Sequence, residues 1–77
     1  MGSLPNNGTA SSFDVATSDG VYTVSGLTIS TISGYSLYGG LLVFHAGGVI
    51  VQIAVTNHAF AARAYVGAWS NWLGTSD

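Results

Sequence analysis

The sequence contains no cysteine, and this absence excludes two ways of stabilising a small domain. Without cysteine there is neither a disulfide framework nor a thiolate cage for a metal ion, and the redox compartment stays open. At 77 residues the chain has room for one domain with a thin core, because such a chain buries only about 60% of the surface that its unfolded form exposes. A small domain without disulfides or a structural metal ion is commonly stabilised by assembly into an oligomer.

Charged side chains are almost as scarce as cysteine. They make up 5% of the sequence, against roughly 25% in typical soluble globular proteins, and Arg63 is the only lysine or arginine. One cation cannot form the basic footprint that neutralises phosphates, so nucleic acid is excluded as a partner. So little charge leaves apolar patches and sheet edges open to association, and we therefore expect an oligomer.

The chain also lacks an apolar run long enough to cross a bilayer. The longest apolar stretch covers residues 39–46, and the N-terminus has neither a basic n-region nor an apolar h-region. We expect a soluble chain without membrane insertion and without a secretion signal of its own. Residues 1–12 have almost nothing to bury, which predicts a flexible leader, a linker from a larger protein or partly a cloning scar before a single domain of residues 13–77.

Short segments rich in valine, isoleucine, tyrosine and threonine alternate with glycine, serine, asparagine and aspartate, which predicts an all-β fold. Strands are predicted at residues 13–16, 21–24, 27–32, 41–46, 49–56 and 59–66. Residues 33–40 hold three glycines and are predicted to form a loop. Its aromatic side chains either pack against the domain or are available to a ligand. The pairs Gly47-Gly48 and Asn57-His58 suit tight hairpins, so the last three strands should form an antiparallel meander.

The two hairpin turns fix a register in which Val43 lies opposite Gln52 and Gln52 lies opposite Arg63. One face of the three strands then carries no polar group and is predicted to be the core. This face holds Leu42, Phe44, Val49, Val51, Ile53, Val55, Phe60, Ala62 and Ala64. The other face is mixed, and a mixed face predicts contact with another subunit or a ligand. It holds Leu41, Val43, His45, Ile50, Gln52, Ala54, Arg63 and Tyr65.

Residues suited to catalysis or metal binding are few. The only acids are Asp14, Asp19 and Asp77, and the sequence has no nucleophile elbow and no metal-ligand spacing. We therefore expect no enzymatic activity, no cofactor and no metal site. The one metal alternative is a symmetry axis lined by copies of His45 or His58.

A more promising constellation surrounds Arg63. A buried arginine needs acceptors, and the cross-strand carbonyl of Gln52 supplies one, so a structural clamp that holds the C-terminal tryptophan segment is favoured over direct ligand contact. Aromatic faces also stack well on sugar rings. If the C-terminal segment is an extended strand, its two tryptophans point to opposite faces. The candidate ligand-binding residues are Tyr35, Tyr38, Gln52, Arg63, Tyr65, Trp69, Asn71 and Trp72.

Over residues 20–73 the order of these motifs resembles the pyocin-knob type domain of phage tail fibres, tailspikes and R-type bacteriocins. The resemblance rests on Gly40-Leu41-Leu42-Val43-Phe44, then Gln52, then Arg63-Ala64-Tyr65, then Trp69-Ser70-Asn71-Trp72. By position it carries over Gln52, Arg63, Trp69 and Trp72, and no catalytic residue. The chain departs from the family in two respects. Residues 34–40 lack the proline often found before the Leu-Val strand, and no fibrous stalk precedes the domain. The missing stalk is consistent with an excised C-terminal fragment or with a short independent protein that uses the same fold.

The resemblance implies an extracellular virion protein, namely a homotrimeric tip joined to an upstream fibre shaft. Such a tip trimerises the fibre, binds a bacterial surface polysaccharide, or does both. Two alternatives stay open. One is a purely structural trimerisation or capping domain, and the other is a stand-alone carbohydrate-binding module attached to a surface enzyme. The latter would be a self-sufficient monomer, so the mass in solution separates it from the others.

Overall fold

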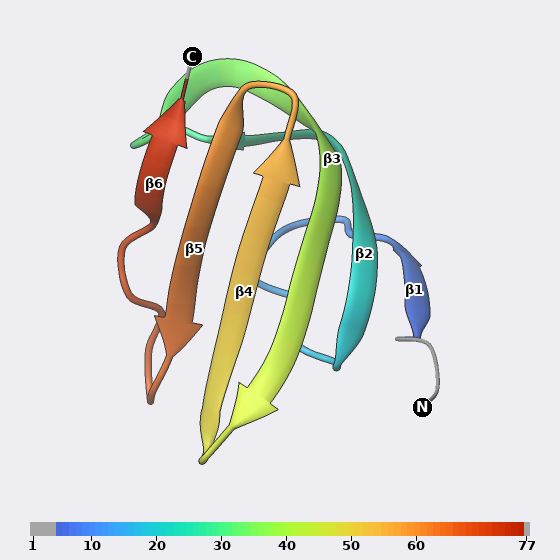
Figure 1. Ribbon diagram of the computed structural model, residues 1–77, viewed down its shortest axis with the longest axis vertical. Helices are drawn as coiled ribbons and strands as arrows, with labels where there is room; N and C mark the ends of the chain where they lie inside the picture. The colour runs from blue at the N-terminus through green and yellow to red at the C-terminus, as the bar shows by residue number, and fades with distance from the viewer. Residues whose placement is uncertain (1–4, 77) are drawn as a thin grey trace.

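The computed structural model describes residues 5–76 and is built from strands. They form one six-stranded sheet whose spatial order follows the chain (Figure 1). The strands are β1 (Asn6–Thr9), β2 (Gly20–Ile29), β3 (Ser33–Ala46), β4 (Val49–Thr56), β5 (Ala59–Tyr65) and β6 (Leu73–Ser76). Neighbours from β2 to β6 are antiparallel, whereas β1 pairs with β2 in parallel. The predicted all-β class is therefore confirmed, and the meander carries a parallel edge strand that makes the sheet mixed.

The central hairpins agree with the prediction from the two turns. Gly47 and Gly48 have φ angles of 58° and 83°, and two positive φ angles in succession are what the preferred two-residue hairpin turn requires. Strand β4 has the predicted bounds, and β5 ends one residue earlier than predicted. The predicted register is confirmed, because Val43 pairs with Gln52 and Gln52 pairs with Arg63.

One face of the sheet, here called the inner face, is covered by residues 10–19, which connect β1 to β2. In Figure 1 this connection passes behind the sheet. Small buried side chains on β4 and β5, Ala54 and Ala61, leave room for the connection to pack close to the sheet. The core consists of Ala10, Phe13, Ala16, Val24, Ile29, Leu37, Leu41, Val43, Ala54, Ala59 and Ala61.

The prediction of which face forms the core was wrong. The mixed face is the inner one, where Leu41, Val43, Gln52 and Ala54 are fully buried. The all-apolar face is the outer one, and none of its nine predicted core residues is classed as buried in the single chain. We call outer face the side that carries Leu42, Phe44, Val49, Val51, Ile53, Val55, Phe60, Ala62 and Ala64, together with Val21 and Leu73. The physical reason is that Gln52 binds the connection that covers its face.

Three segments differ from their predicted conformation. Residues 33–40, predicted as a loop, form the first half of β3, which pairs with β2. Residues 13–16, predicted as a strand, belong to the connection across the inner face. The predicted strands at 21–24 and 27–32 merge into β2, which ends at Ile29 and contains a register shift at Gly26, where φ is 78°. A residue with positive φ permits this irregularity without ending the strand.

The predicted leader of residues 1–12 is also corrected in part. Asn6–Thr9 forms β1, the Val21 amide donates to the Pro5 carbonyl at 2.8 Å, and Ala10 is buried. Backbone pairing with β2 and burial of one small side chain hold this segment on the sheet. Residues 1–4 lie outside the described part of the chain, and so does Asp77. Across residues 5–76 no helix has the length and apolarity needed to span a membrane.

Candidate functional site

Gln52 lies at the centre of the inner face and is fully buried. Its side-chain Nε2 donates to the carbonyls of Phe13 and Ala16 at 2.6 and 2.8 Å, and its Oε1 accepts a hydrogen bond from Arg63 Nε at 2.7 Å. The two carbonyls accept only, and the guanidinium donates only, so just one orientation of the amide satisfies all three partners. Gln52 therefore joins the connection to two strands of the sheet.

Arg63, on β5, extends this network towards the C-terminal segment. Its side chain is 8% exposed, and its second donor, Nη2, binds Asp14 Oδ1 at 2.8 Å. The guanidinium carbon lies 4.0 Å from the ring centroid of Trp69 and 4.6 Å from that of Trp72. The guanidinium is thus held by hydrogen bonds in its plane and by cation–π contacts with two rings. We call Asp14, Gln52, Arg63, Trp69 and Trp72 the arginine cluster.

Both tryptophans contact the same side chain, although the extended-strand interpretation placed them on opposite faces. That interpretation was wrong because residues 70–72 are not in a strand, and Trp69 takes part only in an isolated bridge with Tyr65. Trp72 packs edge-on against Phe13 with centroids 5.0 Å apart, and Trp69 packs edge-on against Tyr65 at 5.2 Å. The geometry is that of the predicted structural clamp, which ties the C-terminal segment to the sheet and to the connection.

A cleft of about 290 Å³ opens beside the arginine cluster. Aromatic and aliphatic walls come from Phe13, Leu27 and Trp72, and polar groups come from Ser12, Asp14, Thr28 and Arg63. Of these, the Asp14 carboxylate is 73% exposed even while it binds Arg63. An apolar wall with a few polar groups around it is the usual composition of a small-molecule site.

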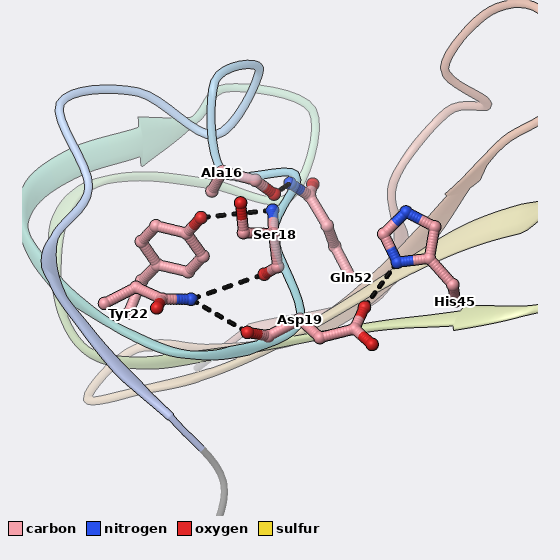
Figure 2. A network of polar contacts seen from close by, with 7 residues as sticks. Ala16, Ser18, Asp19, Tyr22, His45 and Gln52 are labelled. Atoms are coloured by element: carbon pink, nitrogen blue, oxygen red, sulfur yellow. Dashed lines mark hydrogen bonds and ion pairs between the residues drawn. The ribbon is translucent and has the colours of Figure 1, made fainter.

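The other end of the connection is fastened separately, as Figure 2 shows. Asp19 pairs with His45 Nδ1, and Asn7 Nδ2 donates to the carbonyls of Asp19 and Ser18 at 3.0 and 3.4 Å. The Ser18 amide donates to the Tyr22 hydroxyl at 3.2 Å. These contacts are exposed, so each is expected to contribute little to stability. The buried amide of Gln52 is the stronger anchor.

Tyr35 and Tyr38, the predicted loop aromatics, lie on β3 and not in a loop. Both are more than half exposed. The ring of Tyr35 stacks on that of His58 at the β4–β5 turn, with centroids 4.4 Å apart and an angle of 22°. The Tyr38 backbone exchanges hydrogen bonds with Asn57 at 3.0 and 3.1 Å. These tyrosines belong to neither the arginine cluster nor the cleft beside it.

The structure thus divides the candidate residues into two groups and a remainder. Gln52, Arg63, Trp69 and Trp72 meet in one cluster, which Tyr65 borders through Trp69. Asn71 is exposed between the tryptophans, and its carbonyl accepts a hydrogen bond from Ser70 Oγ at 3.3 Å. Within residues 5–76, no three histidine, aspartate or glutamate side chains are grouped so as to hold a metal ion.

Two residues of this site, Phe13 and Asp14, were not among the candidates predicted from the sequence. Asp14 was considered only as an acid and not as the partner of Arg63, although a chain with one arginine and three acids offers few possible pairs. Phe13 was placed on a strand, yet its carbonyl binds Gln52 and its ring packs on Trp72. Both residues lie in the connection, whose path is set by contacts far away in the sequence.

We expect Arg63→Ala to lower the free energy of unfolding by about 1–3 kcal/mol, because it removes the partner of the Gln52 carbonyl oxygen and the packing of two indole rings. Asp14→Ala is the matched control. It removes only the exposed carboxylate, whose place water can take, and keeps the hydrogen bond to Gln52 and both indole contacts, so it should cost less than Arg63→Ala. Urea denaturation monitored by tryptophan fluorescence measures both. Equal midpoints for Arg63→Ala and the unsubstituted chain would show that the guanidinium is an exposed rim group.

Comparison of the chain with protein-family models, with curated proteins and with solved structures found no match in any of the three.

Proposed function

We propose that this chain is a non-enzymatic adhesive tip domain of a phage tail fibre or tailspike. In this proposal it works in the virion, outside the cell, as a homotrimer on a fibre shaft, and it contacts a bacterial surface polysaccharide. The observation that carries the proposal is the arginine cluster. The four positions carried over by the resemblance, Gln52, Arg63, Trp69 and Trp72, come from separate parts of the chain and meet in a single network.

A motif spread over separate segments is informative when its members contact each other, because the spacing then reflects one shared requirement of the fold. Here the requirement is to fasten the C-terminal segment and the connection to the same sheet. This agreement supports the resemblance, although the network is structural and leaves recognition to the surfaces around it.

The cleft beside the cluster is the best supported place for a sugar. The partly buried Trp72 lines the cleft with apolar surface for C–H groups, and the exposed carboxylate of Asp14 offers an acceptor for hydroxyls. A second place is the exposed pair Tyr35 and Tyr38 at the start of β3. The chain has almost no charge for an anionic polymer, so binding to a neutral sugar should change little with salt.

The test is a titration of polysaccharide from the surface of candidate host bacteria against the full chain and three variants. Thr28→Tyr places a ring in the cleft from an exposed strand position without removing a member of the arginine cluster. Tyr35→Ala and Tyr38→Ala remove the second group, and circular dichroism checks the fold of each variant. We expect weak binding per site, in the millimolar to micromolar range, with apparent affinity raised by three copies on one axis. Thr28→Tyr should abolish binding.

Loss of binding in Tyr35→Ala or Tyr38→Ala, with binding retained by Thr28→Tyr, would move the sugar site to the start of β3. Absence of binding by the unsubstituted oligomer to every polysaccharide would contradict the adhesive role. It would leave the second candidate function, a purely structural trimerisation or capping module. The observation that favours this second function is that Arg63 is almost fully buried, with its partners all within the chain.

A further inference from the structure

The charged side chains of the described residues 5–76 are all on one side of the sheet. Arg63 binds Asp14 beside the tryptophans, and Asp19 binds His45 where the connection meets the end of β3. These contacts belong to the inner face and to the connection that covers it. The outer face therefore has no charged side chain among the described residues.

Large apolar side chains are nevertheless exposed on the outer face. Val55, Phe60 and Leu73 are 54%, 57% and 74% exposed, and they lie on β4, β5 and β6. Neighbouring positions on this face are apolar or small, apart from the uncharged Thr23 and Thr75. A contiguous apolar surface without charges is uncommon on a monomer and marks a surface that another molecule covers. Charges on a sheet also prevent unwanted association, and here that protection is missing.

The outer face has both projections and hollows. One hollow of about 400 Å³ lies over β2, β3 and β4, where Gly40 has no side chain. A second hollow, of about 260 Å³, lies over β4, β5 and β6, where Ala62 and Ala64 are small and Leu73 forms part of the rim. The outer face is therefore uneven, and a partner with projecting apolar side chains can fill its hollows.

The outer face also has the size of an interface. Figure 1 looks onto this side, and the outline in that view follows the two longer dimensions of the molecule, 34 and 25 Å. A sheet that fills most of this outline is on the scale of the roughly 800 Å² that each partner contributes to a standard protein interface. Packing of two sheets face to face, about 10 Å apart, is a common way to bury such a surface.

We infer that the outer face is the surface through which copies of this chain associate. A sugar would find few partners for its hydroxyls in the two apolar hollows, and a charged protein would lose hydration without gaining an opposite charge. A second copy brings a surface that is equally free of charge and equally rich in exposed apolar side chains.

A trimer requires that one part of the outer face of each copy meets a different part of the outer face of the next copy. Repeated around a three-fold axis, this head-to-tail contact closes. The number of copies rests on the proposed function, whereas the choice of face does not.

The first test is the mass of the full chain in solution, measured by size-exclusion chromatography with light scattering. The unsubstituted chain should have a multiple of the single-chain mass of 7.8 kDa, and the double variant Phe60→Lys with Leu73→Lys should fall to that mass with an unchanged circular dichroism spectrum. Val66→Lys is the matched control, because Val66 is an equally exposed apolar residue in the turn after β5. It should leave the mass unchanged.

The second test maps the interface with single cysteines, since the chain has none of its own. A cysteine in place of Val55 should react slowly with a polar maleimide in the oligomer and quickly once Phe60→Lys and Leu73→Lys are added. A cysteine in place of Val66 should react quickly in both. The difference in reaction rate between positions 55 and 66, measured without the lysine substitutions, identifies the covered face even if the lysine variant folds poorly.

Each outcome bears on one proposal. A monodisperse monomer at high micromolar concentration would overturn the inference, and binding of that monomer to neutral lipid vesicles would assign the face to a membrane. An oligomer in which the cysteine at position 55 reacts quickly would also overturn it, while the adhesive tip proposal would stand. An oligomer with a protected outer face and no polysaccharide binding would support the inference and contradict adhesion.

Discussion

Gln52→Met is expected to remove about 2–6 kcal/mol of stability, which is a large share of what a domain of this size has. Methionine is close to glutamine in length and volume, so the substitution removes polar partners without opening a large cavity. It leaves the Ala16 carbonyl and the Arg63 Nε donor without a partner, whereas the Phe13 carbonyl keeps the hydrogen bond from the Ala16 amide at 3.3 Å. Each buried polar group left unpaired costs about 1–3 kcal/mol.

The size of this loss matters because small domains are marginally stable. At the usual 0.05–0.15 kcal/mol per residue, a domain of this length has about 4–12 kcal/mol in total. The substitution should also loosen the connection of residues 10–19 locally. The connection packs through Phe13 on Trp72, so its release should change tryptophan fluorescence and expose residues 10–19 to proteases.

Gln52→Glu separates the roles of the two ends of the amide. A carboxylate still accepts from Arg63, and with more charge, but it has no donors for the two carbonyls. We expect this variant to be nearly as unstable as Gln52→Met, because the repulsion between the carboxylate and the two carbonyls outweighs the better pair with Arg63. Urea midpoints at neutral pH measure the difference. Near-normal stability of Gln52→Met would mean that the connection is held by its apolar side chains alone.

The register of the central strands could be predicted because it depends on local information. Gly47 and Gly48 permit the positive φ angles of a two-residue turn, and the strand lengths on either side then place Val43, Gln52 and Arg63 in one row. The cross-strand hydrogen bond between Gln52 and Arg63 follows from that row. This much of the arginine cluster required no knowledge of the rest of the chain.

Which face becomes the core could not be decided in the same way. The usual argument takes the more apolar face as the core, and here it selects the outer face. The structure reverses this choice because the polar groups of the inner face bind backbone atoms of the connection. Gln52 donates to two carbonyls, and Arg63 reaches Asp14. A buried polar side chain that completes the hydrogen bonds of a covering segment resembles a surface residue until the path of that segment is known.

Residues 33–40 failed as a prediction for a related reason. Three glycines in eight residues usually indicate a loop, yet these residues form the first half of β3. Of the three, only Gly39 faces a tight contact, since a side chain at Gly34 or Gly40 would meet open space. At Gly39 the absence of a side chain lets two backbones approach closely. Composition records the glycine but does not reveal whether it supplies flexibility or room.

The close approach at Gly39 leads to the second large expected effect. Gly39 pairs with Val24 on β2 and with Thr56 on β4, in the middle of three strands. A Cβ atom there would overlap the Val55 carbonyl oxygen and lie 2.7 Å from the Thr56 Cα. Both are backbone atoms of β4, so no side chain can rotate away to make space. The substitution Gly39→Ala must therefore separate β3 from β4 or shift the β4–β5 turn.

We expect Gly39→Ala to cost about 3 kcal/mol, at the upper end for overpacking, since the strain falls on the backbone. Gly34→Ala is the matched control, because Gly34 lies on the same strand, has an ordinary φ and faces open space. That change should be neutral or stabilise by up to about 1 kcal/mol, because alanine reduces the entropy of the unfolded chain. Gly40 is nearer but is a poorer control, since its side chain would enter a hollow of the outer face. Thermal unfolding of both variants, with amide exchange at Tyr38 and Asn57 as a local measure, tests the comparison. If the two alanine variants unfold at the same temperature, β3 and β4 are not packed as closely at Gly39 as the structure places them.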